Sequence, residues 1–364
     1  MKIKAVGDIM LGDHPVCIGH GVDSTIRKHG FEFLFDGVRD ALKGGDILFA
    51  NLEAPLSDVG RRPDALSSIE LRGRPDYARR LAMIGFNFIN IANNHAMQHG
   101  IDAFRDTADN LDLAGIRVVG LANGDFCKEV YWSDGQTSII FLGYSLRPEK
   151  FFHGKTPYAL GSEGLVAEHV RKLRRAVNHP IVVSLHWGDE YLNYPSPAQV
   201  RFARGLIDAG ANLILGHHPH VLQGVEQYGS GLIAYSLGNF IFDKWQRNPR
   251  ETIVLSVEIG VNGIESWSVT PVKINKKFQP QIATGSTSAA IESKLFAYSA
   301  ALGNERDPMH RRSSHQYAKI AAKAYLVFRL HSYAYFIRNI QRYELSFIVA
   351  SLKRFLARRV SKEK

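Results

Sequence analysis

The chain has 364 residues, of which 45% are hydrophobic and 22% are charged, a composition typical of a globular protein with a sizeable core. No run of 18 apolar residues occurs, which excludes an ordinary membrane-spanning helix, and the N-terminus lacks the pattern of a signal peptide, so we expect no cleaved leader. Residues 305–364 carry the whole net charge of +10, because they hold 14 Lys and Arg against 4 Asp and Glu. We therefore predict a body over 1–285 and a basic helical extension over 286–364.

Short apolar runs alternate with helix-patterned segments along the body, which predicts an α/β fold. The predicted strands are Ile3–Val6, Ile47–Asn51, Phe86–Ala92, Arg117–Val119, Ser138–Leu142, Ile181–Leu185 and Leu213–Leu215. The predicted helices are Pro75–Ile84, Ile101–Ala114, Gly164–Ala176 and Pro197–Ala209.

The end of the body has a different pattern. Gly231–Asp243, Thr252–Gly260 and Ser266–Ile274 read as strands that follow one another, and the turn residues 261–263 separate the last two. We therefore expect a mixed sheet, parallel in its first part and antiparallel in its last.

Polar and acid/base side chains follow five of the predicted strands directly. Because ligands of open α/β sheets bind at the carboxyl ends of the strands, five segments distant in sequence are expected to meet there. The five clusters are Gly7-Asp8, Asn51-Leu52-Glu53, Asn93-Asn94-His95, His186-Trp187-Gly188-Asp189-Glu190 and Gly216-His217-His218-Pro219-His220.

Each cluster also has a structural interpretation. Asp8 alone could cap a turn, and Glu53 alone could be a solvated loop carboxylate. The three His within 217–220 are harder to explain by structure alone, because imidazole is the commonest side-chain metal ligand. Taken together, the clusters favour a site.

Carboxylate, amide and imidazole groups without thiolates favour Mn, Fe, Zn or Mg as a divalent metal cofactor. Such a site can activate water for hydrolysis of a phosphoester, and a neighbouring His that is not a ligand can transfer the proton. Neither a Gly-x-Ser-x-Gly nucleophile motif nor a Gly-rich phosphate loop occurs. Cys17 and Cys127 lie outside the clusters and do not form a disulfide framework, so we expect a cytoplasmic protein.

The same motifs, together with Tyr235-Ser236-Leu237-Gly238-Asn239-Phe240, resemble those of the CapA family over about residues 2–245. These capsule-synthesis or poly-γ-glutamate-biosynthesis proteins are related in fold to calcineurin-like metallophosphoesterases. The resemblance implies a four-layer α/β/β/α sandwich with a metal site at one rim.

The resemblance also implies a role for individual residues. His95 would be the catalytic acid/base group, next to the ligand Asn94, and further residues would line the site. The implied metal ligands are Asp8, Asn51, Glu53, Asn94, His186, His218 and His220, and the site-lining residues are His217, Glu190 and Asn239. Met10 stands where the superfamily usually has a His ligand, a departure that would weaken one metal position.

Two functions are compatible with these motifs. One is a metal-dependent hydrolase acting on an anionic polymer, of the poly-γ-glutamate or capsule type, or on a phosphoester. The other is a non-catalytic accessory protein that binds such a polymer and a membrane-bound synthase or export complex. Four arginines near Glu53 could bind the substrate's carboxylates or phosphates or lie in a solvated loop, namely Arg61, Arg62, Arg72 and Arg74.

The tail, residues 305–364, combines its positive charge with many aromatic residues. From Leu345 the apolar residues Leu345, Val349, Leu352 and Leu356 follow a helical stripe, with Lys353, Arg354, Arg358 and Arg359 close by. We expect either peripheral contact with the inner face of a membrane or docking on the body. Nucleic-acid binding is disfavoured, because no recognisable module interleaves aromatic platforms with the basic residues.

Overall fold

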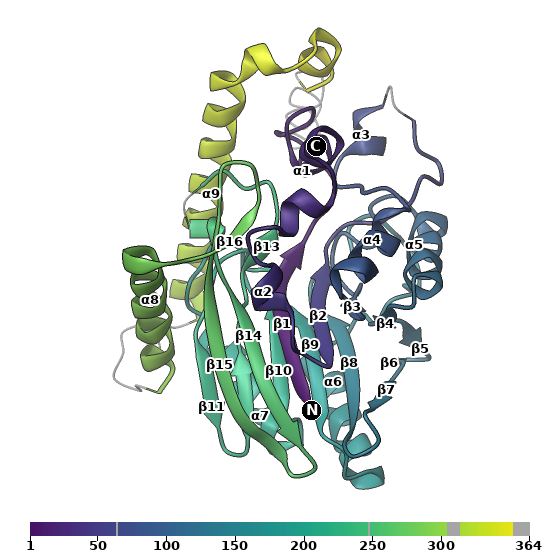
Figure 1. Cartoon of the computed structure of the whole chain (residues 1–364), viewed down its shortest axis with the longest axis vertical. Coiled ribbons are helices and arrows are strands. Elements are labelled where there is room, and N and C mark those ends of the chain that lie inside the picture. The colour runs from purple at the N-terminus through teal and green to yellow at the C-terminus, as the bar shows by residue number, and fades with distance from the viewer. Residues whose placement is uncertain (63–64, 247, 304–313, 352–364) are drawn as a thin grey trace.

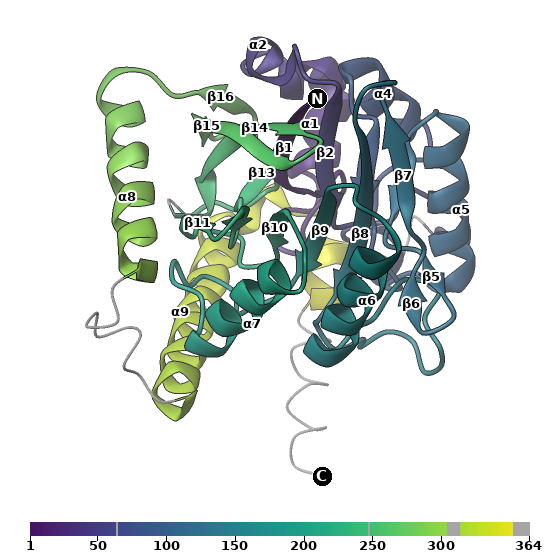
Figure 2. The same cartoon turned by 90° about the horizontal axis from the view of Figure 1, so that it is seen from below.

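The computed structural model describes residues 1–62, 65–246, 248–303 and 314–351. Two large β-sheets pack face to face (Figures 1 and 2). The first sheet contains β1 (Lys2–Ile9), β2 (Ile47–Leu52), β3 (Phe88–Asn90), β4 (Arg117–Val119), β13 (Asn239–Ile241), β14 (Glu251–Gly260), β15 (Gly263–Ile274) and β16 (Pro280–Ile282). Its order in space is β16-β15-β14-β1-β2-β3-β4, and β13 pairs with the end of β1.

The second sheet has the order β11-β12-β10-β9-β8-β7. Its strands are β7 (Val130–Ser133), β8 (Ser138–Ser145), β9 (Ile181–His186), β10 (Leu213–His217), β11 (Val225–Tyr228) and β12 (Gly231–Ala234). A small hairpin of β5 (Ala122–Asn123) and β6 (Phe126–Cys127) stands apart from both sheets.

Helices cover the outer face of each sheet. The first sheet packs against α1 (Val22–His29), α4 (Tyr77–Ile84) and α5 (Ile101–Leu113), with shorter elements η1 (Glu32–Phe35), α2 (Arg39–Leu42) and α3 (Leu66–Ile69) nearby. The second sheet packs against α6 (Glu163–Ala176) and α7 (Pro197–Asp208). Ser162 and Ser196 cap the last two helices, since each hydroxyl accepts a first-turn N–H. The four-layer α/β/β/α arrangement is therefore confirmed (Figure 2).

The layer between the sheets is largely apolar, and the central strands carry mostly hydrophobic side chains on both faces. Phe49, Phe88 and Phe141 stack across this layer with ring centroids 4.7 to 5.8 Å apart. Burying one such side chain contributes roughly 1.5–3 kcal/mol. Polar side chains are therefore expected at the ends of these strands rather than along them.

All of the strands and helices predicted between residues 3 and 215 form, with shifted ends. The prediction of one strand over Gly231–Asp243 is wrong, because the chain leaves the second sheet after β12 and enters the first sheet as β13. Gly238 lies in the turn between them with φ of 72°, and its carbonyl leaves no room for a side chain at Gly7.

The C-terminal extension begins with α8 (Gly285–Gly303), whose Ile291 and Leu295 join the core between the sheets. After it come α9 (Ser314–Arg338), η3 (Ile340–Arg342) and a helical segment over 345–351, while η2 (Asn248–Arg250) precedes β14. None of the described helices is both long and apolar enough to cross a membrane. The predicted boundary at residue 285 coincides with the start of α8 and stays a prediction.

Candidate metal centre

Strand pairing brings the predicted residues abreast at the carboxyl ends of the strands. In the first sheet Asp8 pairs in register with Asn51 of β2 and with Asn239 of β13. In the second sheet His217 of β10 pairs with His186 of β9. The two rows face each other, because the ring of His217 lies 3.1 Å from Asp8.

Asp8 is fully buried and is held from three directions. Its Oδ1 accepts hydrogen bonds from the amide of Asn51 at 2.9 Å and from Nδ1 of His217 at 3.1 Å, and its Oδ2 accepts one from the backbone N–H of His218. Burial alone would raise the pKa of Asp8, but the hydrogen bond from His217 and the nearby imidazoles lower it to about 2. Asp8 is therefore a carboxylate at neutral pH.

Glu53 lies at the centre of the cluster and its carboxylate accepts no hydrogen bond from the described residues, although it is fully buried. Its Oε1 is 3.7 Å from Nε2 of His186, 3.6 Å from Nε2 of His220 and 3.9 Å from Nε2 of His95. Burial and the charge of Asp8 raise the pKa of Glu53 well above its ordinary value. A cation at this point would offset both effects.

His220 is oriented by Asn239. The Asn239 amide donates to the carbonyls of His220 and Pro249, so its oxygen is the acceptor for Nδ1 of His220 at 2.9 Å. Nδ1 therefore carries the hydrogen, and the lone pair of Nε2 faces Glu53. This second contact, which fixes the tautomer, is the usual companion of a metal-binding imidazole.

His218 is buried, and neither of its ring nitrogens has a hydrogen-bond partner among the described residues. Burial holds its pKa well below the ordinary value, so the ring is neutral and able to bind a metal. The backbone is strained at this point, since φ is 93° at His218 and 59° at His220. Strain of this kind costs about 1–3 kcal/mol per residue and concentrates at functional sites.

His186 and Asn94 form the other side of the cluster. The Asn94 Oδ1 is 2.7 Å from Nε2 of His186, and Asn51 lies 3.4 Å from its Nδ1. The Asn51 oxygen accepts from Asn90, so both ends of the Asn51 amide are already engaged within the protein. In this arrangement Asn51 positions Asp8. Of the two predicted ligands Asn51 and Glu53, only Glu53 has side-chain oxygens without a hydrogen-bond partner among the described residues.

The donor atoms fit a divalent cation. Two sets of ligand atoms lie within 4.8 Å of one another, Glu53 with His218 and His220, and Asp8 with Glu53 and His186. Glu53 belongs to both sets, which is the position of a group that would bridge two ions. The unpartnered carboxylate and the unpartnered imidazole of His218 support the fit, because buried polar groups normally have partners.

His95 lies beside this cluster rather than within it. Its Nδ1 is 2.7 Å from Oε1 of Gln98, and its side chain is 21% exposed, whereas the grouped donors are buried. Enclosure by the surrounding protein lowers the pKa of His95 to about 4, partly opposed by Gln98. The ring is thus neutral near pH 7 and can accept a proton.

Two predicted site-lining residues remain. His217 holds Asp8, and Glu190 lies near His220, Lys244 and His95; burial raises the pKa of Glu190, but its interactions with these groups outweigh burial and lower it. Met10 lies in a small apolar cluster with Ala54, Leu71 and Phe242. No imidazole therefore occupies that position, in agreement with the departure noted in the sequence.

The four arginines have different partners. Arg72 is buried, and its guanidinium donates to the carbonyls of Ser57, Val59 and Ser68, so it holds its own loop together, and its substrate role stays a prediction. Arg61 pairs with Asp58 at 2.7 Å, and Arg74 lies 3.6 Å from Asp23. Substrate binding by Arg61, Arg62 and Arg74 stays a prediction.

The sequence interpretation missed Lys244, a buried cation beside the cluster. Its ammonium lies 4.8–5.7 Å from the ring centroids of Phe328, Phe242 and Tyr191 and donates to the Tyr191 hydroxyl at 3.3 Å. No carboxylate lies within 4.0 Å of it in the described parts of the chain. Tyr191 also stacks on His220, with ring centroids 6.0 Å apart. The last sequence motif, residues 235–240, runs into strand β13, and Lys244 follows that strand closely. This proximity to the motif was the sequence signal that could have indicated Lys244.

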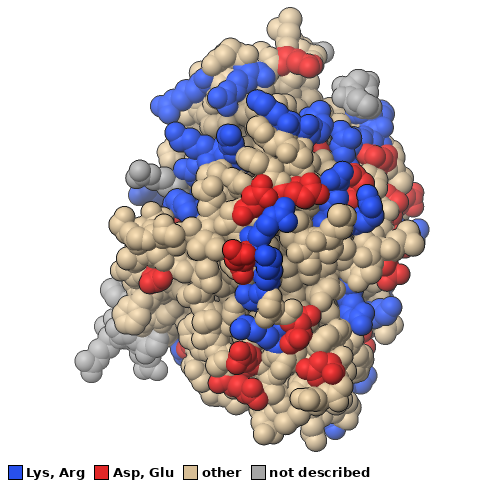
Figure 3. All heavy atoms as spheres, viewed as in Figure 1, with Lys and Arg blue, Asp and Glu red and all other residues tan. Residues whose placement is uncertain are grey.

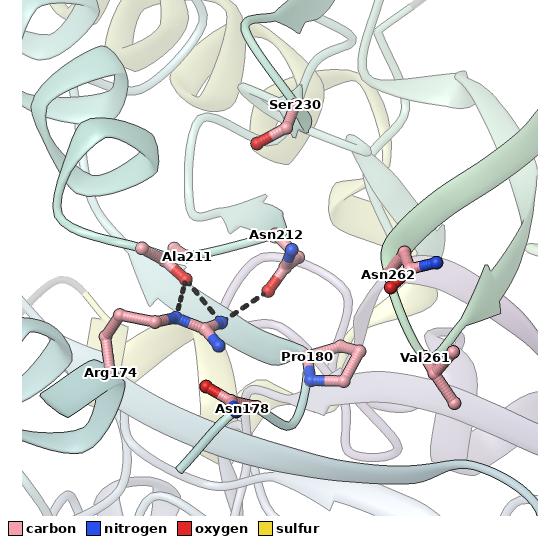
Figure 4. Close-up of a pocket in the computed structure, with 9 residues that line it drawn as sticks. Arg174, Asn178, Pro180, Ala211, Asn212, Ser230, Val261 and Asn262 are labelled. Carbon is pink, nitrogen blue, oxygen red and sulfur yellow. Dashed lines mark hydrogen bonds between the residues drawn. The ribbon is translucent and has the colours of Figure 1, made fainter. Parts of the chain in front are cut away.

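A separate cavity of about 390 Å³ lies at the opposite ends of the strands, lined by residues before β9, β10 and β12 (Figure 4). There Arg174 already donates to the carbonyl of Gly210 and to the side chain of Asn212. Ligands of such folds bind at the carboxyl ends of the strands, so this cavity is not the candidate site.

Comparison with known proteins gives the following similarities. Residues 2–244 match the family described as bacterial capsule synthesis protein PGA_cap. The PGA biosynthesis protein CapA of Bacillus subtilis is 32% identical over 286 residues, which are 76% of this chain and 72% of that protein. The capsule biosynthesis protein CapA of Bacillus anthracis is 31% identical over 76% of this chain and 68% of its own length.

More distant similarities also occur. The probable polyglutamine synthesis accessory protein of Mycobacterium tuberculosis is 26% identical over 54% of this chain and 56% of its own length. The solved sulfate thiohydrolase SoxB of Thermus thermophilus covers 82% of this chain and 60% of its own, with 14% identity and a TM-score of 0.44, too low to support an argument.

Proposed function

Because this chain belongs to the family of bacterial capsule synthesis proteins, we propose that it acts on an anionic polymer or a phosphoester as a metal-dependent hydrolase. The observation that carries the proposal is the buried Glu53 carboxylate, which has no hydrogen-bond donor in the described part of the chain and is surrounded by His186, His218 and His220. A buried carboxylate among neutral imidazoles is stable when a cation joins them.

Each residue would then have a specific task. Asp8, Glu53, Asn94, His186, His218 and His220 would hold the cation or cations, while His217 and Asn239 orient Asp8 and His220. When bound, a divalent ion supplies a Lewis acid and lowers the pKa of water. His95, neutral near pH 7 and 3.9 Å from Glu53, would accept and return a proton at its Nε2.

Lys244 supports an anionic substrate. The Lys244 ammonium feels the charge of Glu190 but has no carboxylate within 4.0 Å among the described residues, so it retains two N–H groups beyond the one given to Tyr191, and a carboxylate or phosphate group can accept them. Poly-γ-glutamate, which the family resemblance implies, and phosphoesters both carry such negatively charged groups. We therefore assign Lys244 to the binding of a substrate anion.

The test is turnover by the purified full chain loaded with Mn²⁺ or Zn²⁺, with bis(4-nitrophenyl) phosphate and poly-γ-glutamate as separate substrates. We expect hydrolysis of at least one of them, which Glu53→Gln and His218→Ala reduce at least a hundredfold. His179→Ala is the matched control, because His179 is exposed and lies outside the cluster. Equal rates for all three variants would contradict the proposal.

The accessory role is the second candidate, favoured by the name of the Mycobacterium tuberculosis relative and by the enclosure of the cluster. It predicts binding of poly-γ-glutamate without turnover in the presence of any of the four metals. Calorimetric titration with the polymer, run beside the turnover assay, separates the two functions.

A further inference from the structure

Helix α9 has two apolar faces, of which one contacts the body. On the inner face the Tyr317 hydroxyl donates to the carbonyl of Tyr194, Phe328 stacks on Tyr191 with centroids 4.0 Å apart, and Tyr335 stacks on Trp245 at 4.4 Å. The spacing of 11 and 7 residues places these three rings on one side of the helix. The contacts of the inner face explain why α9 lies on the body, but they do not explain why the outer face is apolar.

The outer face carries a second apolar stripe. Leu326, Leu330 and Ile337 recur at intervals of four and seven residues, the period of a single helical face. All three are exposed, Leu330 to 57% and Ile337 to 66%. Ile340 in η3 and Leu345 and Val349 in the segment 345–351, which follow the helix, are exposed as well. Contiguous exposed apolar surface of this kind marks an interaction site.

The charged residues around the stripe are almost all positive. The five exposed cations of the described tail are Lys319, Lys323, Arg329, Arg338 and Arg342. Glu344 is the single acidic residue between 314 and 351. Figure 3 shows Lys and Arg gathered on the upper part of the molecule, where Figure 1 places the end of α9, while Asp and Glu lie mainly lower.

We propose that the outer face of α9 lies on the surface of an anionic lipid bilayer. An apolar stripe flanked by Lys and Arg is the pattern of a helix that lies in the membrane interface, and each cation near an anionic surface strengthens the binding. The cations within α9 and the absence of a membrane-crossing helix among the described residues favour a position on the bilayer rather than through it.

The positive charge of this surface also favours an anionic bilayer over a second copy of the chain as its binding partner. A second copy of the chain would bring the same cations against one another, at a cost in electrostatic free energy. A bilayer rich in anionic headgroups neutralises all five. Of the predicted stripe from Leu345, Leu345 and Val349 are exposed, while Leu352, Leu356 and the basic residues 353–359 lie outside the described residues.

The test is co-sedimentation of the full chain with vesicles of phosphatidylglycerol and phosphatidylcholine, compared with phosphatidylcholine alone. We expect binding to the anionic vesicles that weakens as salt rises. Combined Leu326→Ser, Leu330→Ser and Ile337→Ser should reduce the bound fraction at least tenfold. Combined Lys319→Gln, Lys323→Gln and Arg329→Gln should remove the preference for anionic vesicles.

Two matched controls accompany these variants. Met83→Ser, Leu113→Ser and Phe296→Ser remove three exposed apolar side chains from α4, α5 and α8, and Lys28→Gln, Lys43→Gln and Lys155→Gln remove three exposed cations elsewhere. Both controls should bind as the unaltered chain does. Negligible binding of the unaltered chain, or equal loss in the variants and controls, would overturn the proposal. Sedimentation velocity showing a dimer that only the α9 serine variant dissociates, without vesicle binding, would assign the face to self-association instead.

Discussion

The ring of Phe328 stacks on the ring of Tyr191 with centroids 4.0 Å apart and an angle of 12° between the planes. Phe328 belongs to the C-terminal extension, and Tyr191 stacks in turn on His220 of the candidate metal centre. The extension therefore forms one wall of the site, although the two residues are 137 positions apart in the chain. The contact links the position of α9 to access to the cluster.

Phe328→Ala should loosen α9 from the body. The loss of a half-buried aromatic contact costs about 1–2 kcal/mol, so amide hydrogen exchange in residues 314–338 should become faster while the central strands stay protected. Hydrogen exchange followed by mass spectrometry measures this. Phe296→Ala removes an exposed ring of α8 and should leave the exchange of α9 unchanged. Equal exchange in both variants would show that the stacking does not hold α9.

His186→Ala and His218→Ala should reduce the metal content of the purified protein. Each removes one nitrogen from a set of ligand atoms that lie within 4.8 Å of one another, and loss of a ligand leaves the coordination incomplete. Elemental analysis of protein dialysed against Mn²⁺ or Zn²⁺ gives the ratio per chain. His179→Ala should retain the ratio of the unaltered protein, and retention by all three variants would exclude this centre.

His95→Ala should reduce the rate of hydrolysis by about 10²–10⁴ while metal content changes little, because proton transfer is separate from metal affinity. Gln98→Ala should have a smaller effect, since Gln98 only holds Nδ1 of His95, at 2.7 Å. Metal content and turnover are measured on the same preparations. Loss of metal in His95→Ala equal to that in His186→Ala would make His95 a ligand.

Lys244→Met should raise KM for an anionic substrate about tenfold or more and change kcat less, because a charge-assisted hydrogen bond contributes roughly 1.5–3 kcal/mol. Steady-state kinetics with poly-γ-glutamate or a phosphodiester provides both constants. Lys172→Met is the control, since Lys172 also lies over an aromatic ring, 5.4 Å from the centroid of Phe126, but outside the site. An unchanged KM in Lys244→Met would contradict the assignment.

Asp243→Asn should stabilise the protein at alkaline pH. Burial and the nearby Asp13 raise the pKa of Asp243 to about 8, whereas an unfolded Asp has a pKa of about 3.9. The folded state holds an extra proton between these values, so the contribution of Asp243 to stability is present below about pH 4 and is lost as the pH rises through 8. Asn cannot ionise and avoids this loss.

Thermal unfolding at pH 5 and pH 8.5 measures the effect. The advantage of Asp243→Asn should grow with pH and reach on the order of 3 kcal/mol at pH 8.5. Asp36→Asn alters an exposed carboxylate and should show no such growth. An advantage independent of pH would mean that Asp243 is ionised in the folded protein throughout.

Much of the fold and of the cluster could be predicted, because strand periodicity is local and parallel strands align their carboxyl ends. That rule alone brings Asp8, Asn51, His186 and His217 together. Lys244 and Phe328 could not be predicted as neighbours of the site. Their contacts depend on where α9 packs on the body, and the local sequence does not determine that position.

The partners of Arg72 could not be predicted from the sequence. Its context allows a substrate-binding or a solvated cation, whereas in the structure the carbonyls of Ser57 and Ser68 accept hydrogen bonds from the guanidinium. The same limit applies to Gly231–Asp243, where two runs of similar composition belong to different sheets. Which sheet a strand joins depends on the partner available to it, and this is a property of the whole chain.

The position of β1 between β2 and β14 has a consequence for biosynthesis. Lys2 pairs with Glu258, so β1, which meets its neighbour β2 early, receives its other neighbour β14 only after more than 250 further residues have been added. Until then β1 has an unpaired edge, and Asp8, at its end, has no partner strand at β13. A nascent chain therefore carries an apolar, incomplete sheet through most of its synthesis, a state that chaperones protect and that aggregation threatens.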